Sequence, residues 1–154
     1  MKLDLKELIN KLVKAPTQIY IAPSQWSFES GHGSGTIGGD GIRITIFNNG
    51  QMVAFGGQLN ASSFVGGSSG TPYMRTAKPD ELPANKSWSP VGVQRSGQAG
   101  GTTLSSSAWA FRDRIWATTD ANYLYLRSAN YLGSQANGYM EFQLYGAVYP
   151  LEPT

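Results

Sequence analysis

The sequence predicts a mainly β protein: an antiparallel β-sandwich or jelly-roll-like head preceded by a short N-terminal α-helix. Its apolar residues repeat with helical spacing before Pro16 and at every second position after it. Gly/Ser-rich stretches, in a chain with 19 glycines, separate many short strand-like segments. The 154 residues suffice for one core, so we expect a helix over residues 1–15 and one β-domain over residues 16–154.

The first fourteen residues have the pattern of an amphipathic helix. Leu5, Leu8, Ile9 and Leu12 fall at positions i, i+3, i+4 and i+7, and Pro16 ends the pattern. A helix of about 12 residues is only marginally stable alone in water, so this apolar stripe must be buried. We expect it to pack against the same helix of sister chains in a short coiled coil. The alternative is that it packs on its own β-domain.

The clearest β element is a hairpin over residues 41–57. Apolar residues alternate along both halves, and Asn49-Gly50 between them favours a type I′ turn, since both residues tolerate a positive φ. A two-residue loop predicts that Ile46 faces Val53 and Ile44 faces Phe55. That register places the apolar side chains of both strands on one face, as a half-buried antiparallel sheet requires.

Other segments alternate in the same way, with one aliphatic face and one polar face that often carries tyrosine. We expect further strands at Gln18 to Ile21, Ser89 to Gln94, Ser106 to Phe111, Arg114 to Thr118, Tyr123 to Arg127 and Gly138 to Tyr145. We expect surface loops at Ser30 to Gly41, Gly66 to Thr71 and Ser96 to Ser107.

Composition excludes several classes of function. The chain has no cysteine and one histidine, His32, so we expect no thiolate or histidine-cluster metal site and no cofactor. The net charge of +2 comes entirely from residues 1–14, and the rest is balanced, so a nucleic-acid partner is not expected. No apolar run is long enough to span a bilayer or to form a secretion signal, so we expect neither membrane insertion nor a cleaved leader.

Two glycine motifs have catalytic or cofactor-binding spacing but the wrong context. The G-x-G-x-x-G at residues 33–38 requires a following helix, yet a β-hairpin is expected there. The G-x-S-x-G at residues 66–70 requires a later histidine, and His32 precedes it. The loop acids cannot be paired from sequence into a glycosidase site, and we expect Asp113, between two arginines, to form ion pairs. These acids are Asp40, Asp80, Glu81, Asp113 and Asp120.

Aromatic side chains give the most informative binding signal. A flat ring with a polar tip can stack on the C–H face of a sugar while the tip stays hydrated. The competing interpretation is that these rings belong to cores or subunit interfaces. The candidate ligand-binding residues, several of them beside Gly/Ser loops, are Trp26, Tyr73, Trp88, Trp109 and Tyr131.

The order of features resembles a known group of proteins. The opening MKLDLKELINKL resembles the N-terminus of small tail proteins of phages and prophages of Gram-positive gut bacteria. The section from Trp26-Ser-Phe28 to the strand-Asn-Gly-strand block ending at Gly57 is similar to their recurrent pattern, although Ala54-Phe55-Gly56 departs from its usual Ala-acid-Trp. Leu82-Pro83 and Trp88-Ser-Pro90 before a run of strands resemble the head domains of tail-fibre or receptor-binding proteins.

This resemblance implies a homotrimer in the virion, made in the host cytoplasm, with helices bundled at one end and β-heads facing the host. Its partners would be other phage tail proteins and bacterial surface polysaccharide. We therefore expect a non-enzymatic adhesin for cell-surface glycans. The alternatives are a tail or baseplate spacer without a ligand and, less favoured, a glycan-degrading tail enzyme.

Overall fold

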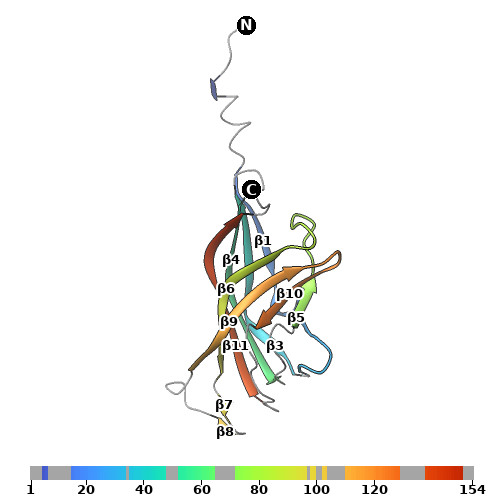
Figure 1. Ribbon diagram of the computed structural model, residues 1–154, viewed down its shortest axis with the longest axis vertical. Helices are drawn as coiled ribbons and strands as arrows, with labels where there is room; N and C mark the ends of the chain where they lie inside the picture. The colour runs from blue at the N-terminus through green and yellow to red at the C-terminus, as the bar shows by residue number, and fades with distance from the viewer. Residues whose placement is uncertain are drawn as a thin grey trace.

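The computed structural model is built almost entirely of antiparallel β-strands, as the sequence predicts (Figure 1). It describes residues 5–6, 15–33, 35–47, 52–64, 72–96, 98–99, 102–103, 110–128 and 138–150. The strands are β1 (Thr17–Ile21), β2 (Ser27–Phe28), β3 (Ile37–Phe47), β4 (Met52–Phe64), β5 (Pro72–Ala77), β6 (Ser87–Ser96), β7 (Gln98–Ala99), β8 (Thr102–Thr103), β9 (Ala110–Thr119), β10 (Tyr123–Ser128) and β11 (Gly138–Pro150). A short 3₁₀ helix, η1 (Pro23–Gln25), lies between β1 and β2.

Nine of these strands form one continuous sheet in the order β1-β3-β4-β11-β6-β9-β10-β5-β2. The two edge strands, β1 and β2, are consecutive in the chain and joined only by residues 22–26. In a flat sheet, strand spacings of about 4.8 Å would place these edges nearly 40 Å apart. Residues 22–26 reach about 20 Å at most. The sheet must therefore curl until its edges approach each other, and we call this junction the seam.

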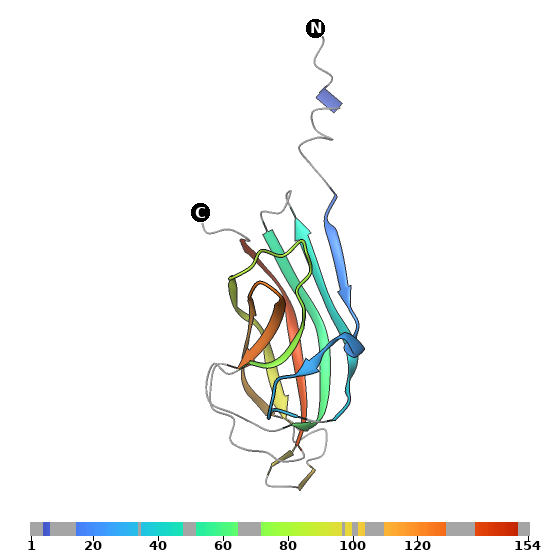
Figure 2. The same ribbon diagram turned by 90° about the vertical axis from the view of Figure 1, so that its right-hand side faces the viewer.

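The curled sheet has two facing layers, as a sandwich would. In Figure 2 the strands β1, β3, β4 and β11 lie on one side, and β6, β9 and β10 lie opposite. Phe55 of β4 and Trp88 of β6 are not on neighbouring strands, yet their ring centroids lie 5.3 Å apart across the core. Fully buried aliphatic side chains fill the space around them, among them Ile42, Ile44, Leu59, Ile115, Leu124 and Leu126.

The β3–β4 hairpin has the predicted register. Ile44 pairs with Phe55 and Ile46 pairs with Val53, and all four side chains are buried. The turn itself, residues 48–51, lies outside the described residues. The alternation of apolar and polar residues along the two strands thus correctly predicted which side chains face the core.

A glycine bulge bends this hairpin further along. The register shifts between Gly38 and Gly41, and Gly57 on the partner strand has φ +121°. A Cβ atom on Gly57 would collide with the carbonyl oxygen of Gly41, so the two backbones approach as only glycine allows. The bulge increases the local twist that curls the sheet.

Some elements differ from the sequence-based expectation. β3 begins at Ile37, inside the stretch expected to be a loop, and β9 runs without interruption from Ala110 through the segment expected at Arg114 to Thr118. β5 was not predicted, because Pro72 and Gly/Ser residues before it resemble a loop. A strand follows the G-x-G-x-x-G stretch, so the helix that motif needs is absent there. Residues 66–70 lie outside the described residues.

The N-terminal segment is described only in part. Leu5 and Lys6 have helical backbone, and the Leu5 side chain is 67% exposed. The other residues of the expected apolar stripe, Leu8, Ile9 and Leu12, lie outside the described residues.

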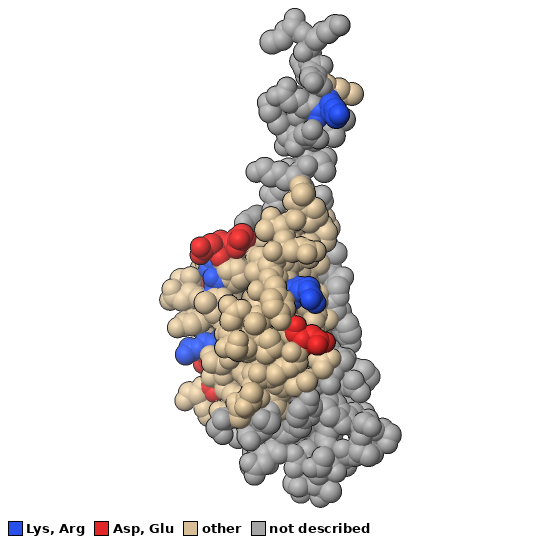
Figure 3. Space-filling view, turned by 180° about the vertical axis from the view of Figure 1, so that it is seen from behind, with Lys and Arg blue, Asp and Glu red and all other residues tan. Residues whose placement is uncertain are grey.

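Charged side chains are sparse on the β-domain. Figure 3 shows a mostly uncharged face of this domain, on which the few Lys/Arg residues lie close to Asp/Glu residues. This distribution agrees with the balanced charge of the chain after residue 14. Within the ranges that the structure describes, no helix has the length and apolar character needed to cross a membrane.

Candidate functional site

The structure places three of the predicted ligand-binding aromatics in the core instead of on the surface. The exposed fractions are 0% for Tyr73, 3% for Trp88 and 5% for Trp26. Tyr73 packs edge-to-face against the half-buried His32 ring, whose centroid lies 5.0 Å away. Burial of large rings stabilises a curled sheet, and it leaves these faces unavailable for stacking on a polymer. Trp109 and Tyr131 lie outside the described residues.

Trp26 differs from the other two because it lines a groove at the seam. Its backbone N–H donates to the carbonyl oxygen of Pro23 at 3.1 Å, which fixes it directly after η1. Its indole Nε1 is buried and finds no acceptor among the described residues. An unpaired buried donor costs about 1–3 kcal/mol, so the lack of an acceptor for this atom needs an explanation.

A set of aromatic and arginine side chains covers the outer side of β5, β9 and β10. Residues directly opposite each other in an antiparallel pair share a face. Tyr125 pairs with Arg75 on one side and with Thr118 on the other, while Arg127 pairs with Trp116. The alternate residues of these strands are buried, so this set points outward. We call it the Arg–Tyr face: Arg75, Arg114, Trp116, Tyr123, Tyr125 and Arg127.

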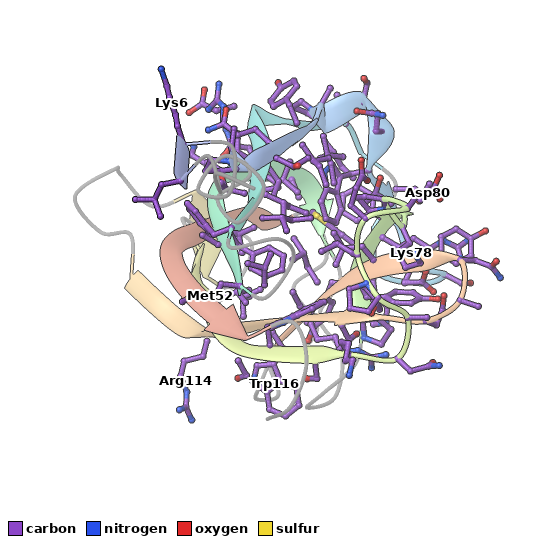
Figure 4. The ribbon with its side chains drawn as sticks, turned by 90° about the horizontal axis from the view of Figure 1, so that it is seen from above. Lys6, Met52, Lys78, Asp80, Arg114 and Trp116 are labelled. Atoms are coloured by element: carbon purple, nitrogen blue, oxygen red, sulfur yellow. The ribbon has the colours of Figure 1, made fainter. Side chains whose placement is uncertain are left out.

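Figure 4 shows Arg114 and Trp116 projecting from the outside of the curled sheet, away from the side chains that fill its interior. Arg114 is exposed, and Trp116 is half-buried, as are Tyr123, Tyr125 and Arg127. The rings are thus partly supported by their neighbours and still accessible, which suits a binding platform.

Arg75 is held in place at one end of this face. Its Nε lies 3.0 Å from Oε1 of Glu29, an ion pair whose angle falls outside hydrogen-bond geometry. Its guanidinium carbon lies 4.5 Å from the ring centroid of Tyr123, a cation–π distance. Glu29 is positioned by its backbone N–H, which donates to the carbonyl oxygen of Tyr73 at 2.9 Å.

Tyr125 is held from two sides. Its hydroxyl donates to Oδ2 of Asp120 at 2.7 Å, and its ring centroid lies 5.6 Å from the guanidinium carbon of Arg127. The Nε of Arg127 donates to Oγ1 of Thr118 at 2.8 Å. The ring of Tyr123 lies 6.0 Å from that of Tyr125. Side chains fixed in this way lose little freedom when a ligand binds.

These contacts shift two ionisation equilibria. The hydrogen bond from Tyr125, with backbone N–H donors from Asn122 and Tyr123, holds the pKa of Asp120 below its ordinary value. Donation to Asp120 raises the pKa of Tyr125, and partial burial adds to the rise. At neutral pH the site therefore presents an ionised carboxylate and an un-ionised phenol.

The chemistry of the Arg–Tyr face suits hydroxyl-rich ligands. Its rings offer surfaces for C–H groups, its guanidiniums can donate hydrogen bonds in a planar fork, and the Asp120 carboxylate beside them is an acceptor. Sugars present these complementary groups together on one flat ring. Among the described residues of this face, no side chain pairs with a neighbouring base in the way that an activated nucleophile does.

Among the described loop acids, Asp120 has an environment that does not suit glycoside hydrolysis. Asp120 already accepts three hydrogen bonds, and its lowered pKa opposes a role as general acid. Asp40, Asp80 and Glu81 are exposed, and the side chain of Asp113 lies outside the described residues. In the part of the chain that the structure describes, no three His, Asp or Glu side chains are grouped to hold a metal ion.

Sequence reasoning could have found part of this face. The alternation Tyr-Leu-Tyr-Leu-Arg over residues 123–127 already puts both tyrosines and Arg127 on one side. Arg75 and Glu29 give no such signal, because they reach the face through pairings between β2, β5 and β10 that join distant parts of the chain.

Comparisons of the chain with protein-family models, with curated proteins and with solved structures found no match.

Proposed function

We propose that this protein is a head domain of the tail-fibre or receptor-binding type from a phage tail, which adheres to bacterial cell-surface glycans as a homotrimer. The Arg–Tyr face is the observation that carries the proposal. It combines accessible rings and guanidiniums held by their neighbours on one outer surface of the sheet, with the ionised Asp120 carboxylate beside them. In this proposal the protein acts by binding and does not cleave the glycan; the lowered pKa of Asp120 favours this choice over hydrolysis, because a general acid needs a raised pKa.

The N-terminal segment supplies the trimer in this proposal. Leu5 is helical and 67% exposed, as expected for a residue that meets sister chains. Three parallel helices would place three β-domains on one side, and the similarity of the opening residues to phage tail proteins points the same way. In the virion, this assembly would contact other tail proteins at one end and the host surface at the other.

Binding to purified cell walls tests the adhesive function. The full-length protein is incubated with a panel of cell walls and wall polysaccharides from Gram-positive gut bacteria, and retention is measured by pull-down. The Tyr123→Ala/Tyr125→Ala double variant should lose affinity by about tenfold or more, because it removes both stacking surfaces. Circular dichroism verifies that the variant is folded.

Tyr20 provides a matched control. It is a tyrosine on β1, 53% exposed, with the guanidinium carbon of Arg43 5.4 Å from its ring centroid, and it belongs to the opposite layer. Tyr20→Ala should leave retention unchanged. Equal loss in both variants would contradict a site on the Arg–Tyr face. Absence of binding to the whole panel would instead support the tail or baseplate spacer.

A further inference from the structure

A groove lies at the seam, between the η1–β2 segment and the start of β3. It has a volume of about 460 Å³, within the range of roughly 300–1,000 Å³ that is usual for small-molecule sites. Its lining includes no charged residue, so it suits an uncharged ligand. We call it the seam groove; it is lined by Pro23, Ser24, Trp26, Ser27, Phe28, Gly33, Gly35, Thr36 and Ile37.

The indole N–H of Trp26, a residue that lines this groove, lacks a hydrogen-bond acceptor in the described part of the chain. The side chain is 5% exposed and lines the groove, and its Nε1 has no acceptor among the residues described. A buried N–H without an acceptor destabilises the free protein. Because Nε1 is itself buried, an acceptor oxygen in the groove reaches it through a small turn of the indole, and that contact would remove the penalty. The unpaired donor therefore favours ligands with such an oxygen.

Phe28 and Gly33 form an apolar wall of the groove. A Cβ atom on Gly33 would lie 2.6 Å from Cδ1 of the Phe28 ring, so the ring rests directly on the glycine backbone. Ile37, at the start of β3, adds a second apolar surface. A small apolar group of the ligand, such as a methyl, would fit against this wall.

Hydroxyl groups complete the lining. Ser24, Ser27 and Thr36 all border the groove, and each hydroxyl can donate and accept hydrogen bonds. Ser27 donates only a long contact of 3.5 Å to the carbonyl oxygen of Arg75. The groove therefore combines an indole donor, a methyl-sized apolar wall and hydroxyls in one uncharged site.

We propose that the seam groove binds one uncharged sugar residue that carries an acetamido group. The acetamido carbonyl oxygen accepts the hydrogen bond from Trp26 Nε1, its methyl group packs on Phe28 and Ile37, and the serine and threonine hydroxyls contact the sugar hydroxyls. A carboxylated or phosphorylated sugar is disfavoured, because its charge would have no counter-charge among the lining residues. This inference rests on the proposed glycan-binding function and names the sugar class for a separate site.

Nuclear magnetic resonance on the ¹⁵N-labelled full-length protein tests the proposal. N-acetylglucosamine is titrated, and glucose, which carries a hydroxyl in place of the acetamido group, is the matched control ligand. The Trp26 indole N–H signal should move downfield and saturate with N-acetylglucosamine, and it should not respond to glucose. Equal responses to both sugars, or no response to either, would overturn the proposal.

Variants are followed through the ligand, by saturation transfer to its acetyl methyl protons. Trp26→Phe removes the donor and should abolish the transfer, whereas Trp88→Phe alters an equally buried ring outside the groove and should preserve it. Gly33→Ala displaces the Phe28 ring without removing any polar group, so it should also abolish the transfer. This second variant tests the proposal even when Trp26→Phe does not fold. Full transfer in folded Trp26→Phe or Gly33→Ala contradicts the assignment.

The Tyr123→Ala/Tyr125→Ala variant separates this inference from the proposed function. It should keep the full response to N-acetylglucosamine while losing retention on cell walls. If the protein binds cell walls through the Arg–Tyr face but shows no response to N-acetylglucosamine, the seam-groove assignment alone is refuted. If the protein responds to N-acetylglucosamine but binds no cell wall, only the adhesive function of the Arg–Tyr face is refuted.

Discussion

Asp120 accepts three hydrogen bonds at the end of the β9–β10 hairpin. The backbone N–H groups of Asn122 and Tyr123 donate to Oδ1, and the Tyr125 hydroxyl donates to Oδ2. The same carboxylate thus shapes the turn between two strands and orients a ring of the Arg–Tyr face. Local turn chemistry and the binding surface depend on one side chain, which makes its ionisation a useful probe of both.

Removing the Tyr125 hydroxyl should raise the pKa of Asp120 toward its ordinary value. That hydroxyl is the largest cause of the lowered pKa. A ¹³C carboxyl titration of the Tyr125→Phe variant measures the change. Tyr123→Phe is the control, because Tyr123 contributes its backbone N–H and the substitution keeps all three hydrogen bonds. An unchanged Asp120 titration in Tyr125→Phe would show that this hydroxyl does not stabilise the carboxylate.

The two shifts act on stability at opposite ends of the pH scale. The folded-state pKa of Asp120 is lowered, so its stabilisation is present at neutral pH and is lost as pH falls below about 4. The folded-state pKa of Tyr125 is raised, so its stabilisation is lost as pH rises above about 10. In urea unfolding, Tyr125→Phe should weaken the dependence of stability on pH in both windows.

The exposure of single aromatic residues was hard to predict from sequence for a physical reason. Trp88 and Tyr73 follow loop-like residues, and nothing local says which side of the sheet they face. Their burial depends on long-range partners: Phe55 across the core for Trp88 and His32 for Tyr73. Tyr125, in a regular alternation with buried leucines, could be assigned to the outer face from its neighbours alone.

At the scale of elements, the β3–β4 hairpin was predictable because its signals are local. Alternating residues and a nearby turn determine which side chains pair, and Ile44 meets Phe55 as expected. The position of β11 between β4 and β6 was not predictable, because it joins the end of the chain to two distant strands. Pairing of this kind depends on the curl of the whole sheet.

The glycine bulge should be the least tolerant point of this hairpin. Gly57→Ala would place a methyl against the Gly41 carbonyl oxygen on a backbone with φ +121°, and should destabilise the fold by about 2 kcal/mol or more. Gly56→Ala is the adjacent control, since a Cβ there meets nothing within 4 Å. Urea unfolding of both variants measures the difference. Equal stability of the two would contradict a bulge that only glycine can form.

At the scale of the whole molecule, the seam and the Arg–Tyr face lie on connected elements. β2 pairs with β5, and Ser27 of the seam groove lies opposite Arg75 of the Arg–Tyr face. A glycan chain could therefore contact both regions of one β-domain. Single sugar sites are typically weak, at about millimolar affinity, so adhesion to a cell surface needs several of them at once.

Assembly through the N-terminal stripe should supply this multivalency. Light scattering of the full-length protein should give three times the 16.6 kDa mass of one chain. Leu5→Asp/Leu12→Asp places charges in the stripe and should yield a monomer, while Lys6→Ala, on the polar side, should preserve the trimer. A full-length protein that scatters as one chain would refute the coiled coil and favour packing of the helix on its own β-domain.

The monomeric variant also separates affinity from avidity. The described core residues include none of residues 1–14. The β-domain of the monomeric variant should therefore unfold at the same urea concentration as that of the trimer. Its response to N-acetylglucosamine should be unchanged, because the seam groove is built within one chain. Its retention on cell walls should fall by about 10²–10⁴-fold, the usual gain from linking weak sites. Retention equal to that of the trimer would mean that one β-domain binds the glycan by itself, and that trimerisation serves assembly of the tail alone.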